Sequence, residues 1–186
     1  MGNKIDCGKY PLIYPLPIAL ISANVDGKAN AAPIGNCGIV SVDPAVIYIS
    51  INKQSYTAKG ILSEGEFGIN FASCDMIKEI DRAGMVSGRD IDKSSFFQYF
   101  YDESSKTPIV ENCAVNIICK VISTTVVHNQ LMFVADIEKT LVSESCCTNG
   151  YADTKKINPI IYAMDNQYWS LGEHLGTGFN IGKDLL

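Results

Sequence analysis

The chain has 186 residues, of which 47% are hydrophobic and 19% charged, and its formal net charge is -5. This length fits one domain, and this composition is typical of a globular protein and excludes the disordered and fibrous classes. The acidic balance argues against nucleic acid or an acidic membrane as a general partner. We therefore expect a single domain over residues 1–186, with no nucleic-acid and no membrane partner.

The N-terminal segment and the cysteines narrow the class further. Residues 1–9 have no apolar core, and the apolar run from Leu16 to Ala23 is too short to span a bilayer, so we expect a cytoplasmic protein. The seven cysteines include no CxxC pair, and the chain has only two histidines. This pattern does not suit a zinc site or the disulfide framework of a secreted protein. No metal is expected. The adjacent Cys146 and Cys147 are either a redox-active pair or, more simply, two thiols in a loop.

In chain order, the first predicted elements are strands joined by tight turns. Leu16 to Ala23 predicts a strand, and Asp26-Gly27 predicts a two-residue hairpin turn because both residue types tolerate positive φ. The following stretch, KANAAPIGNCGIV, is rich in small residues that let backbone approach something flat, and we expect its proline to interrupt any regular ladder. The β-branched run from Ala45 to Ile51 then predicts a buried strand.

This strand ends abruptly in polar residues, NKQSYT, which lead into a short predicted helix over Ala58 to Leu62. Ser55 or Thr57 is the candidate N-cap. A helix N-terminus flanked by hydroxyls and Lys53 suits a dianionic phosphate. A capped helix with no ligand is the simpler alternative.

The second half of the chain predicts mostly strands. A helix is expected over Cys74 to Ala83, capped by Ser73 and ended by Gly84, and a second helix is expected after Asp92. That second segment carries an aromatic cluster, typical of a core or a subunit interface, made of Phe96, Phe97, Tyr99 and Phe100. Strands are expected at 65–72, 114–126, 131–142, 159–163 and 168–171. The pattern predicts a mainly β fold, an antiparallel barrel with peripheral helices.

Two more segments carry chemistry. SGRDIDK, from Ser87 to Lys93, concentrates two cations and two carboxylates and suggests a site. The alternative is a solvated loop in which Lys93 forms a surface ion pair with Asp90 or Asp92. His128 precedes an apolar strand, where a structural histidine is as reasonable as a ligand. The chain has no GxSxG, GxGxxG or P-loop motif, so hydrolase, dinucleotide-fold and P-loop chemistries are not indicated.

Together, these segments resemble a known family. The order YPLP, DGKANAAPIGNCGIVSVDP, ISINKQSYT, GEFGINF, SGRDIDK, His128 before a strand, and YWSLG is similar to that of the flavin reductase-like FMN-binding split-barrel family, nearest to its flavoredoxin branch. The resemblance extends from about Leu16 to Lys183. It implies a six-stranded Greek-key split β-barrel and a homodimer that binds FMN near the subunit interface.

The resemblance also implies a set of site residues. Those placed against the isoalloxazine ring are Asn30, Ala31, Ala32, Pro33 and Asn36. Those that hold the ribityl chain and phosphate are Asn52, Ser55, Tyr56 and Thr57. The pocket is completed by Gly88, Arg89, Asp90 and Lys93, and His128 is the implied catalytic residue that receives nicotinamide or another donor.

In one respect the chain departs from the family. The segment Ile34 to Gly38 lacks the aromatic residue that many two-component flavin reductases carry there. Stacking on the ring would then come from Tyr168 or Trp169, or the flavin face is open to a partner. Because of this departure, the resemblance is a weaker argument that NAD(P)H is the direct electron donor of this chain.

The implied function is an FMN flavoprotein oxidoreductase. It would pass electrons from NAD(P)H or a low-potential carrier protein such as ferredoxin, through FMN, to a small or protein acceptor. One alternative is a non-catalytic module that binds or stores FMN or another phosphate ligand. Another is a thiol-redox or metal protein built on the cysteines.

Overall fold

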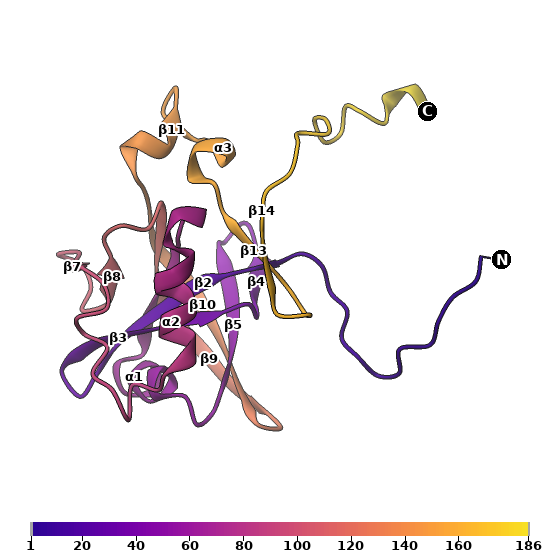
Figure 1. The fold of residues 1–186 in the computed structure, drawn as a ribbon. Helices are drawn as coiled ribbons and strands as arrows, with labels where there is room; N and C mark the ends of the chain where they lie inside the picture. The colour runs from indigo at the N-terminus through magenta and orange to yellow at the C-terminus, as the bar shows by residue number, and fades with distance from the viewer. Residues whose placement is uncertain (1, 186) are drawn as a thin grey trace.

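The computed structural model describes residues 2–185, and its centre is a seven-stranded antiparallel sheet (Figure 1). The strands pair in the order β3-β2-β6-β9-β10-β5-β4. Their bounds are β2 Ala19–Val25, β3 Lys28–Ile34, β4 Cys37–Ser41, β5 Val46–Asn52, β6 Glu66–Phe71, β9 Val115–Val127 and β10 Gln130–Val142. The mainly β fold expected from the sequence is confirmed.

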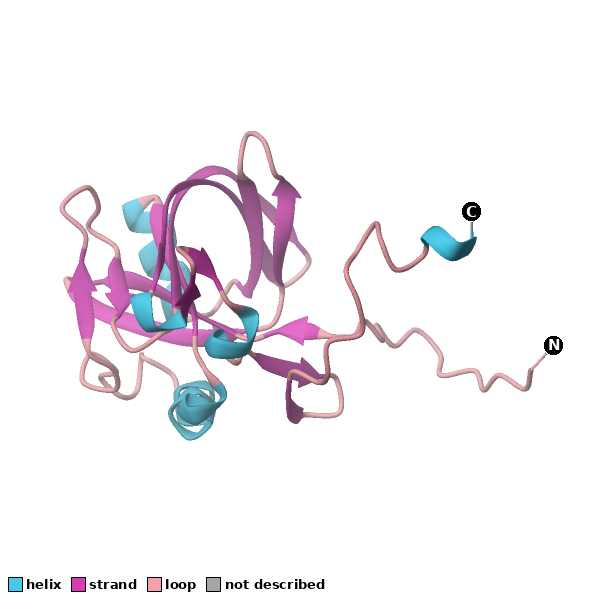
Figure 2. Ribbon diagram, turned by 90° about the horizontal axis from the view of Figure 1, so that it is seen from above, coloured by secondary structure: helices cyan, strands magenta, loops and turns pink. Residues whose placement is uncertain are grey.

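The sheet is curled into a barrel, as Figure 2 shows. Its edge strands, β3 and β4, are separated in the chain by only Gly35 and Asn36, so the two edges of the sheet lie close together. They are not paired with each other, which leaves the barrel split between them. Because β4 turns away from β3 and pairs with β5, the sheet has seven strands and not six.

The barrel is filled by residues that alternate along its strands. In β5, Ile47, Ile49 and Ile51 are buried while their neighbours are only partly covered, as the two-residue period of a strand requires. Phe67 of β6 and Phe133 of β10 are fully buried in the same core. This core fixes the strand ends from which the polar residues of the candidate site extend.

Pro33 does not interrupt the ladder, contrary to expectation. It lies within β3 and pairs with Leu20 of β2. Strand β3 is at the edge of the sheet and has β2 as its one neighbour. The proline nitrogen, which has no hydrogen to donate, can therefore face away from β2 without the loss of a ladder hydrogen bond. The stretch KANAAPI is therefore a regular edge strand, and its Ala31 and Pro33 lie against the helix that contains Ala83 and Gly84.

Two helices pack outside the barrel. Helix α1 spans Tyr56–Glu64 with Ser55 as its N-cap residue, so the predicted helix begins two residues earlier than expected. The predicted helix over 74–83 is a 3₁₀ turn, η1 (Cys74–Met76), followed by α2 (Ile77–Met85). Gly84 therefore does not end the helix. A Cβ at Gly84 would lie 3.0 Å from Cγ of Pro33, so the glycine instead lets α2 approach β3 closely.

The helix expected after Asp92 is absent from the described residues. Oδ1 of Asp92 accepts a hydrogen bond from the Ser94 amide at 2.9 Å. This side-chain bond stabilises a turn, and the chain does not continue from it into a helix. The chain then forms β7 (Tyr99–Tyr101), which pairs with β8 (Pro108–Val110). Phe96, Phe97 and Tyr99 pack on a second buried cluster, so most of the aromatic cluster belongs to the protomer's own core.

The rest of the chain forms small elements and two extended ends. A three-stranded sheet is made of β1 (Leu16–Pro17), β13 (Ile160–Ala163) and β14 (Gln167–Ser170). The remaining elements are β11 (Cys147–Thr148), β12 (Tyr151–Ala152), α3 (Thr154–Ile157), η2 (Glu144–Cys146) and η3 (Lys183–Leu185). Residues 2–15 and 171–185, here called the terminal arms, run away from the body on one side (Figures 1 and 2). None of the described helices is long and apolar enough to cross a membrane.

Candidate functional site

The candidate site is a cavity of about 290 Å³ between β3, the N-terminus of α1 and the C-terminal end of α2. Its walls come from three parts of the chain that are far apart in sequence. The lining residues are Asn30, Ala32, Pro33, Ser55, Tyr56, Thr57, Ala83, Gly84, Met85, Val86, Ser87, Gly88 and Lys93. Parts of three segments described in the sequence, KANAAPIGNCGIV, NKQSYT and SGRDIDK, thus meet at one place.

The N-terminus of α1 opens into this cavity with its backbone amides uncapped. Ser55 has the extended backbone of an N-cap residue, with φ -60° and ψ 138°, yet its side chain makes no capping hydrogen bond. The turn before it is closed by Asn52, whose Oδ1 accepts from the Gln54 amide and whose carbonyl accepts from the Ser55 amide. The first amides of a helix have no intrahelical partner, so this end offers donors to an anion.

Asn30 and Thr57 form the buried wall of the cavity. Nδ2 of Asn30 donates to Oγ1 of Thr57 at 2.8 Å, and both residues are buried. Oδ1 of Asn30 is buried and has no hydrogen-bond partner among the described residues. Because an unpaired buried carbonyl is costly, this oxygen indicates a ligand that supplies a donor.

Gly88 leaves the space in front of this wall open. A Cβ at Gly88 would lie 2.3 Å from Oδ1 of Asn30 and 2.5 Å from Cδ1 of Tyr56. Both separations are shorter than any ordinary contact. The absent side chain therefore keeps open a cradle between the SGRDIDK segment and the start of α1.

Lys93 is the cation of this cavity, and it is only 4% exposed. Its Nζ donates to the carbonyl of Ala83 at 2.7 Å and to that of Ala31 at 3.3 Å. Burial lowers the pKa of Lys93 below its usual value. An ammonium group has three donors, so one remains for the cavity. The alternative of a surface ion pair is wrong, since Lys93 is buried and Asp92 is paired with Lys28 at 2.6 Å.

A smaller cavity of about 210 Å³ continues from the first. The two share Asn30, Tyr56, Gly88 and Lys93 in their walls. The smaller cavity adds Lys28, Ala29, Arg89, Asp90, Ile91 and Asp92. Nη2 of Arg89 donates to the carbonyl of Gln54 at 2.8 Å, which links the SGRDIDK segment to the turn before α1.

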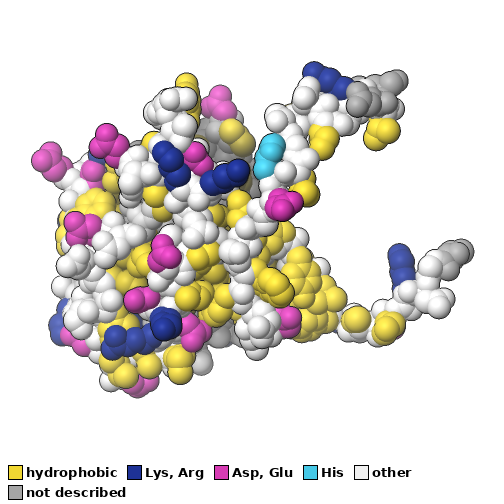
Figure 3. Space-filling view, turned by 45° about the horizontal axis from the view of Figure 1, so that its top comes forward, with side chains coloured by type: hydrophobic (Ala, Val, Ile, Leu, Met, Phe, Trp, Pro, Cys, Tyr) yellow, Lys and Arg dark blue, Asp and Glu magenta, His cyan; other side chains and the backbone are white. Residues whose placement is uncertain are grey.

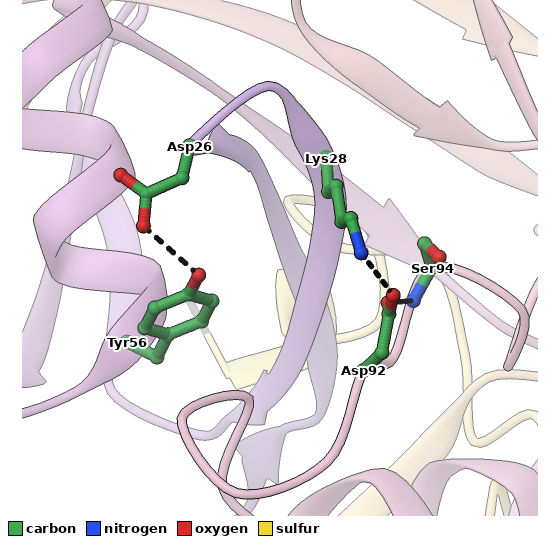
Figure 4. A network of polar contacts seen from close by, with 5 residues as sticks. All are labelled: Asp26, Lys28, Tyr56, Asp92 and Ser94. Carbon is green, nitrogen blue, oxygen red and sulfur yellow. Dashed lines mark hydrogen bonds and ion pairs between the residues drawn. The ribbon is translucent and has the colours of Figure 1, made fainter.

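The β2–β3 hairpin is tied to both sides of this smaller cavity, as Figure 4 shows. On one side, Asp26 accepts from the hydroxyl of Tyr56 at 3.1 Å and pairs with Lys59 at 2.6 Å. On the other side, Lys28 pairs with Asp92. The Lys59 ammonium and then the Tyr56 hydroxyl lower the pKa of Asp26, and Lys28 lowers that of Asp92. These contacts are exposed, so they position the hairpin more than they stabilise it.

The matching family model is that of the flavin reductase like domain, over residues 12–164. The chain belongs to the flavin reductase-like family. Within the family it is similar to the flavoredoxin of Methanosarcina acetivorans, at 35% identity and a TM-score of 0.96 over 100% of both chains. It is also similar to the flavoredoxin of Desulfovibrio vulgaris (Miyazaki F), at 31% identity and a TM-score of 0.89 over 97% of this chain and 100% of that one. The expected flavoredoxin branch is thus confirmed.

A third solved structure shows the fold of the family. It is a protein of Shewanella frigidimarina with a split barrel domain, 15% identical, with a TM-score of 0.79 over 88% of this chain and 85% of that one. At this identity the likeness extends to the fold alone. The predicted split β-barrel is confirmed.

The structure brings together most, but not all, of the residues that the family resemblance implied. Those that line the larger cavity are Asn30, Ala32, Pro33, Ser55, Tyr56, Thr57, Gly88 and Lys93. Arg89 and Asp90 line the smaller one. Ala31 lies behind the wall, where its carbonyl accepts from Lys93. Their contact with a ligand stays a prediction.

Asn36, Asn52 and His128 lie outside both cavities. The carbonyl of Asn36 accepts from the Ser50 amide, which places Asn36 beside β5. His128 occupies the exposed turn between β9 and β10 with φ 53°. The next residue, Asn129, accepts from the Lys53 amide, so the turn lies beside the end of β5. A role for His128 toward a bound donor stays a prediction.

Sequence reasoning missed the part of the wall that α2 provides. Ala83, Gly84 and Met85 of α2 and the following Val86 line the larger cavity, and Lys28 of β3 lines the smaller one. The small residues Ala83 and Gly84 on one turn were the available signal for a close approach. Tyr168 and Trp169, considered as stacking residues, line neither cavity; Tyr168 instead packs on Tyr162 and donates to Asp81 at 3.0 Å.

The cysteines contribute nothing visible to this site. No group of three or more His, Cys, Asp or Glu side chains within residues 2–185 is placed to hold a metal ion. Burial raises the pKa of the Cys37 thiol to about 11 and that of Cys113 to about 12. Such thiols are poor nucleophiles.

Proposed function

We propose that this chain is an FMN-binding flavoprotein oxidoreductase of the flavoredoxin type. The observation that carries the proposal is an uncapped helix N-terminus that shares one cavity with a buried lysine bonded only to carbonyls. A cavity with this donor set suits a phosphate monoester. FMN combines such a phosphate with a flat ring, and the wall of small residues along β3 suits that ring.

In this proposal the phosphate lies at the start of α1. The backbone amides of Tyr56 and Thr57 donate to it, together with the hydroxyls of Ser55 and Thr57. Oγ1 of Thr57 already accepts from Asn30, so its own proton is available to donate. The remaining donor of Lys93 supplies positive charge nearby. Charge-assisted bonds of this kind are the stronger class.

Ala32 and Pro33 of β3, which line the cavity, would hold the ring. Oδ1 of Asn30, which has no donor among the described residues, would accept a hydrogen bond from the flavin. When bound, the flavin supplies the electron chemistry of the reaction. The protein's part is to orient it, exclude water on the β3 side and hold positive charge at Lys93.

We propose NAD(P)H or a low-potential carrier protein as the electron donor and a small molecule or protein as the acceptor. A cytoplasmic location is consistent with seven cysteines that form no disulfide within the described residues. The second candidate function, storage of FMN without turnover, is favoured by the position of His128 outside the cavities. Anaerobic mixing of the flavin-loaded protein with NADH, NADPH or reduced ferredoxin distinguishes the two. Bleaching of the flavin absorbance supports the enzyme, and a spectrum unchanged by every donor supports storage.

Ser55→Ala tests the phosphate position. If Ser55 were only a helix cap, its loss would lower the free energy of unfolding by about 1 kcal/mol. Because its side chain makes no capping bond, we expect unchanged stability and an FMN affinity reduced about tenfold or more, since a hydrogen bond to a charged group contributes about 1.5–3 kcal/mol. Fluorescence titration with FMN and urea unfolding measure the two quantities. Reduced stability with unchanged affinity would overturn the assignment.

Gly88→Ala tests the cradle. The added methyl group would meet Oδ1 of Asn30 and the ring of Tyr56, so we expect FMN binding to be lost or strongly weakened. The matched control is Gly172→Ala, because a Cβ at Gly172 meets no atom within 4 Å. Equal FMN affinity in the two variants would place the ligand elsewhere.

A further inference from the structure

We infer that the β2–β3 hairpin is a clamp on the candidate site: its two ion pairs hold closed a flap, defined here as residues 87–92, and thereby set how fast a bound phosphate ligand leaves. The inference rests on the proposed function in one respect, since the ligand is taken to be FMN. It adds a control of ligand release to the binding that the cavity provides.

The flap covers both cavities of the site. Its first two residues line the larger cavity, and residues 88–92 line the smaller one. Residues 86–92, all in the described part of the chain, form no helix or strand. The amides of Asp90 and Ile91 both donate to the carbonyl of Ser87 at 3.1 Å, so the segment is folded on itself. Such a segment can move as a unit while the elements beside it stay in place.

Both ends of the flap are fixed. Helix α2 ends at Met85, just before the flap. Lys93, just after it, is 4% exposed and donates to the carbonyls of Ala31 and Ala83. Between these ends, residues 89–92 are all exposed. Opening therefore concerns the exposed part of the flap and does not require the buried lysine to leave its place.

Two side-chain contacts tie the exposed part of the flap to the walls of the site. Oδ2 of Asp92 pairs with Nζ of Lys28, the first residue of β3, at 2.6 Å. Oδ1 of the same carboxylate accepts from the Ser94 amide at 2.9 Å, which fixes the direction of the side chain. At the other wall, Nη2 of Arg89 donates to the carbonyl of Gln54 at 2.8 Å. The Lys28 and Asp92 side chains are 67% and 49% exposed, so their contact can break and re-form while the fold stays intact.

The other ion pair of the hairpin holds Tyr56, the first residue of α1. Asp26, in the hairpin turn, pairs with Lys59 at 2.6 Å and accepts from the Tyr56 hydroxyl at 3.1 Å. Tyr56 lines both cavities and lies against the flap, because a Cβ at Gly88 would be 2.5 Å from its Cδ1. Figure 4 shows Tyr56 and Asp92 on opposite sides of the hairpin. The hairpin thus joins the flap to the helix start where the phosphate is proposed to bind.

Exposed ion pairs suit a clamp better than a structural support. A pair of this kind shifts an equilibrium by about fivefold at most, which is small against the stability of a fold. On a flap, the same factor changes the fraction of open molecules directly, and with it the release rate. Figure 3 shows cationic and acidic side chains side by side on the surface of the body, and salt weakens exposed pairs of this kind. Ligand release should consequently become faster as the salt concentration rises.

The experiment measures the rate at which FMN leaves the loaded protein, from the change in flavin fluorescence after dilution. The variants are Lys28→Met, Asp92→Asn and the two combined; asparagine keeps an oxygen that can accept from the Ser94 amide. Each single variant should release FMN about two- to fivefold faster than the wild type. The double variant should release it no faster than the single ones, because both changes break the same pair.

The two single variants separate the clamp from a simple effect of charge. If the side chains acted only through their charge on the phosphate, loss of the lysine would speed release and loss of the carboxylate would slow it. The clamp predicts faster release in both variants. Opposite effects, or two unchanged rates, would overturn it.

Lys139→Met is the matched control, because it breaks another ion pair of 2.6 Å, with Asp102, and neither residue lines the two cavities. It should release FMN like the wild type. Hydrogen exchange of the flap amides in the ligand-free protein, followed by mass spectrometry, tests the clamp without FMN. Exchange should be faster in Lys28→Met and Asp92→Asn and unchanged in the control. A protein that binds no FMN would refute the proposed function, whereas equal flap exchange in the wild type and all variants would overturn the clamp.

Discussion

At the scale of single residues, the site depends on buried polar groups whose partners are incomplete. Within residues 2–185, Nζ of Lys93 donates to two backbone carbonyls and forms no ion pair, and Oδ1 of Asn30 is buried without a donor. Both cost folding free energy unless a ligand or water meets them. Such residues are retained for binding more readily than for stability, and together they mark the cavity.

The buried Lys93 should make the free energy of unfolding of the flavin-free protein depend on pH. Its pKa is lowered in the folded state from the usual 10.5, so between the folded and unfolded pKa values the unfolded chain binds more protons. Stability relative to Lys93→Met should therefore rise as pH increases through that window, and the cost of burying the charge is fully present below it. Urea unfolding of both proteins over alkaline pH measures the difference. A bound phosphate ligand favours the charged lysine, so it should abolish this rise in stability with pH. A stability difference between wild type and Lys93→Met that does not change with pH would show that burial does not lower the pKa of Lys93.

At the scale of elements, α1 is held against β2 by a glycine where a helix favours alanine. A Cβ at Gly60 would lie 2.3 Å from the carbonyl oxygen of Asn24 and 2.8 Å from Cγ2 of Val25. The same close packing occurs where Gly84 lets α2 approach Pro33. Of these two contacts, the one between Gly84 and Pro33 borders the cavity, since both residues line it.

Gly60→Ala should consequently destabilise the protein although it raises helix propensity. Propensity contributes about 1 kcal/mol in favour of alanine, while steric overlap with backbone costs about 1–3 kcal/mol or more when nothing can move aside. We expect a net loss of about 1–2 kcal/mol in the free energy of unfolding, measured with urea. Ser63→Ala, at an exposed position of the same helix, is the control and should be neutral or slightly stabilising. A more stable Gly60→Ala protein would show that α1 does not sit this close to β2.

At the scale of the whole molecule, one buried asparagine joins distant parts of the chain. Nδ2 of Asn70 donates to the Leu20 carbonyl at 2.8 Å and to Oγ of Ser22 at 2.9 Å. Its Oδ1 accepts from the Val110 amide at 3.0 Å and from Nδ2 of Asn116 at 2.8 Å. Asn70 on β6 therefore links β2, β8 and β9, and fixes the β7–β8 segment to the barrel.

Asn70→Ala should lower the free energy of unfolding by about 3 kcal/mol or more, because each buried group left without a partner costs about 1–3 kcal/mol. Thermal and urea unfolding measure the loss. Asn129→Ala, in the exposed β9–β10 turn, is the control and should change stability little. A loss no greater than that of the control would mean that water replaces the side chain in this network.

The sequence by itself determined the fold class and most strands. Alternating apolar residues and turn signals act locally, so β5, β6, β9 and β10 could be predicted within one or two residues. The family resemblance extended from about Leu16 to Lys183, and it implied site residues in KANAAPIGNCGIV, NKQSYT and SGRDIDK, parts of which the structure brings to one cavity. Local rules failed at Pro33, Gly84 and the segment after Asp92, where neighbours in space override propensity.

Only the tertiary structure decided how these segments meet. The sequence left Lys93 open between a pocket cation and a surface ion pair, because burial depends on the helix and strand that cover it, which no local pattern reveals. The wall from Ala83 to Met85 exists because α2 packs on β3, and the exposed arms are recognisable only once the body is folded without them. Residue types fix what chemistry is available, whereas packing across long sequence separations fixes which groups lose water and face each other.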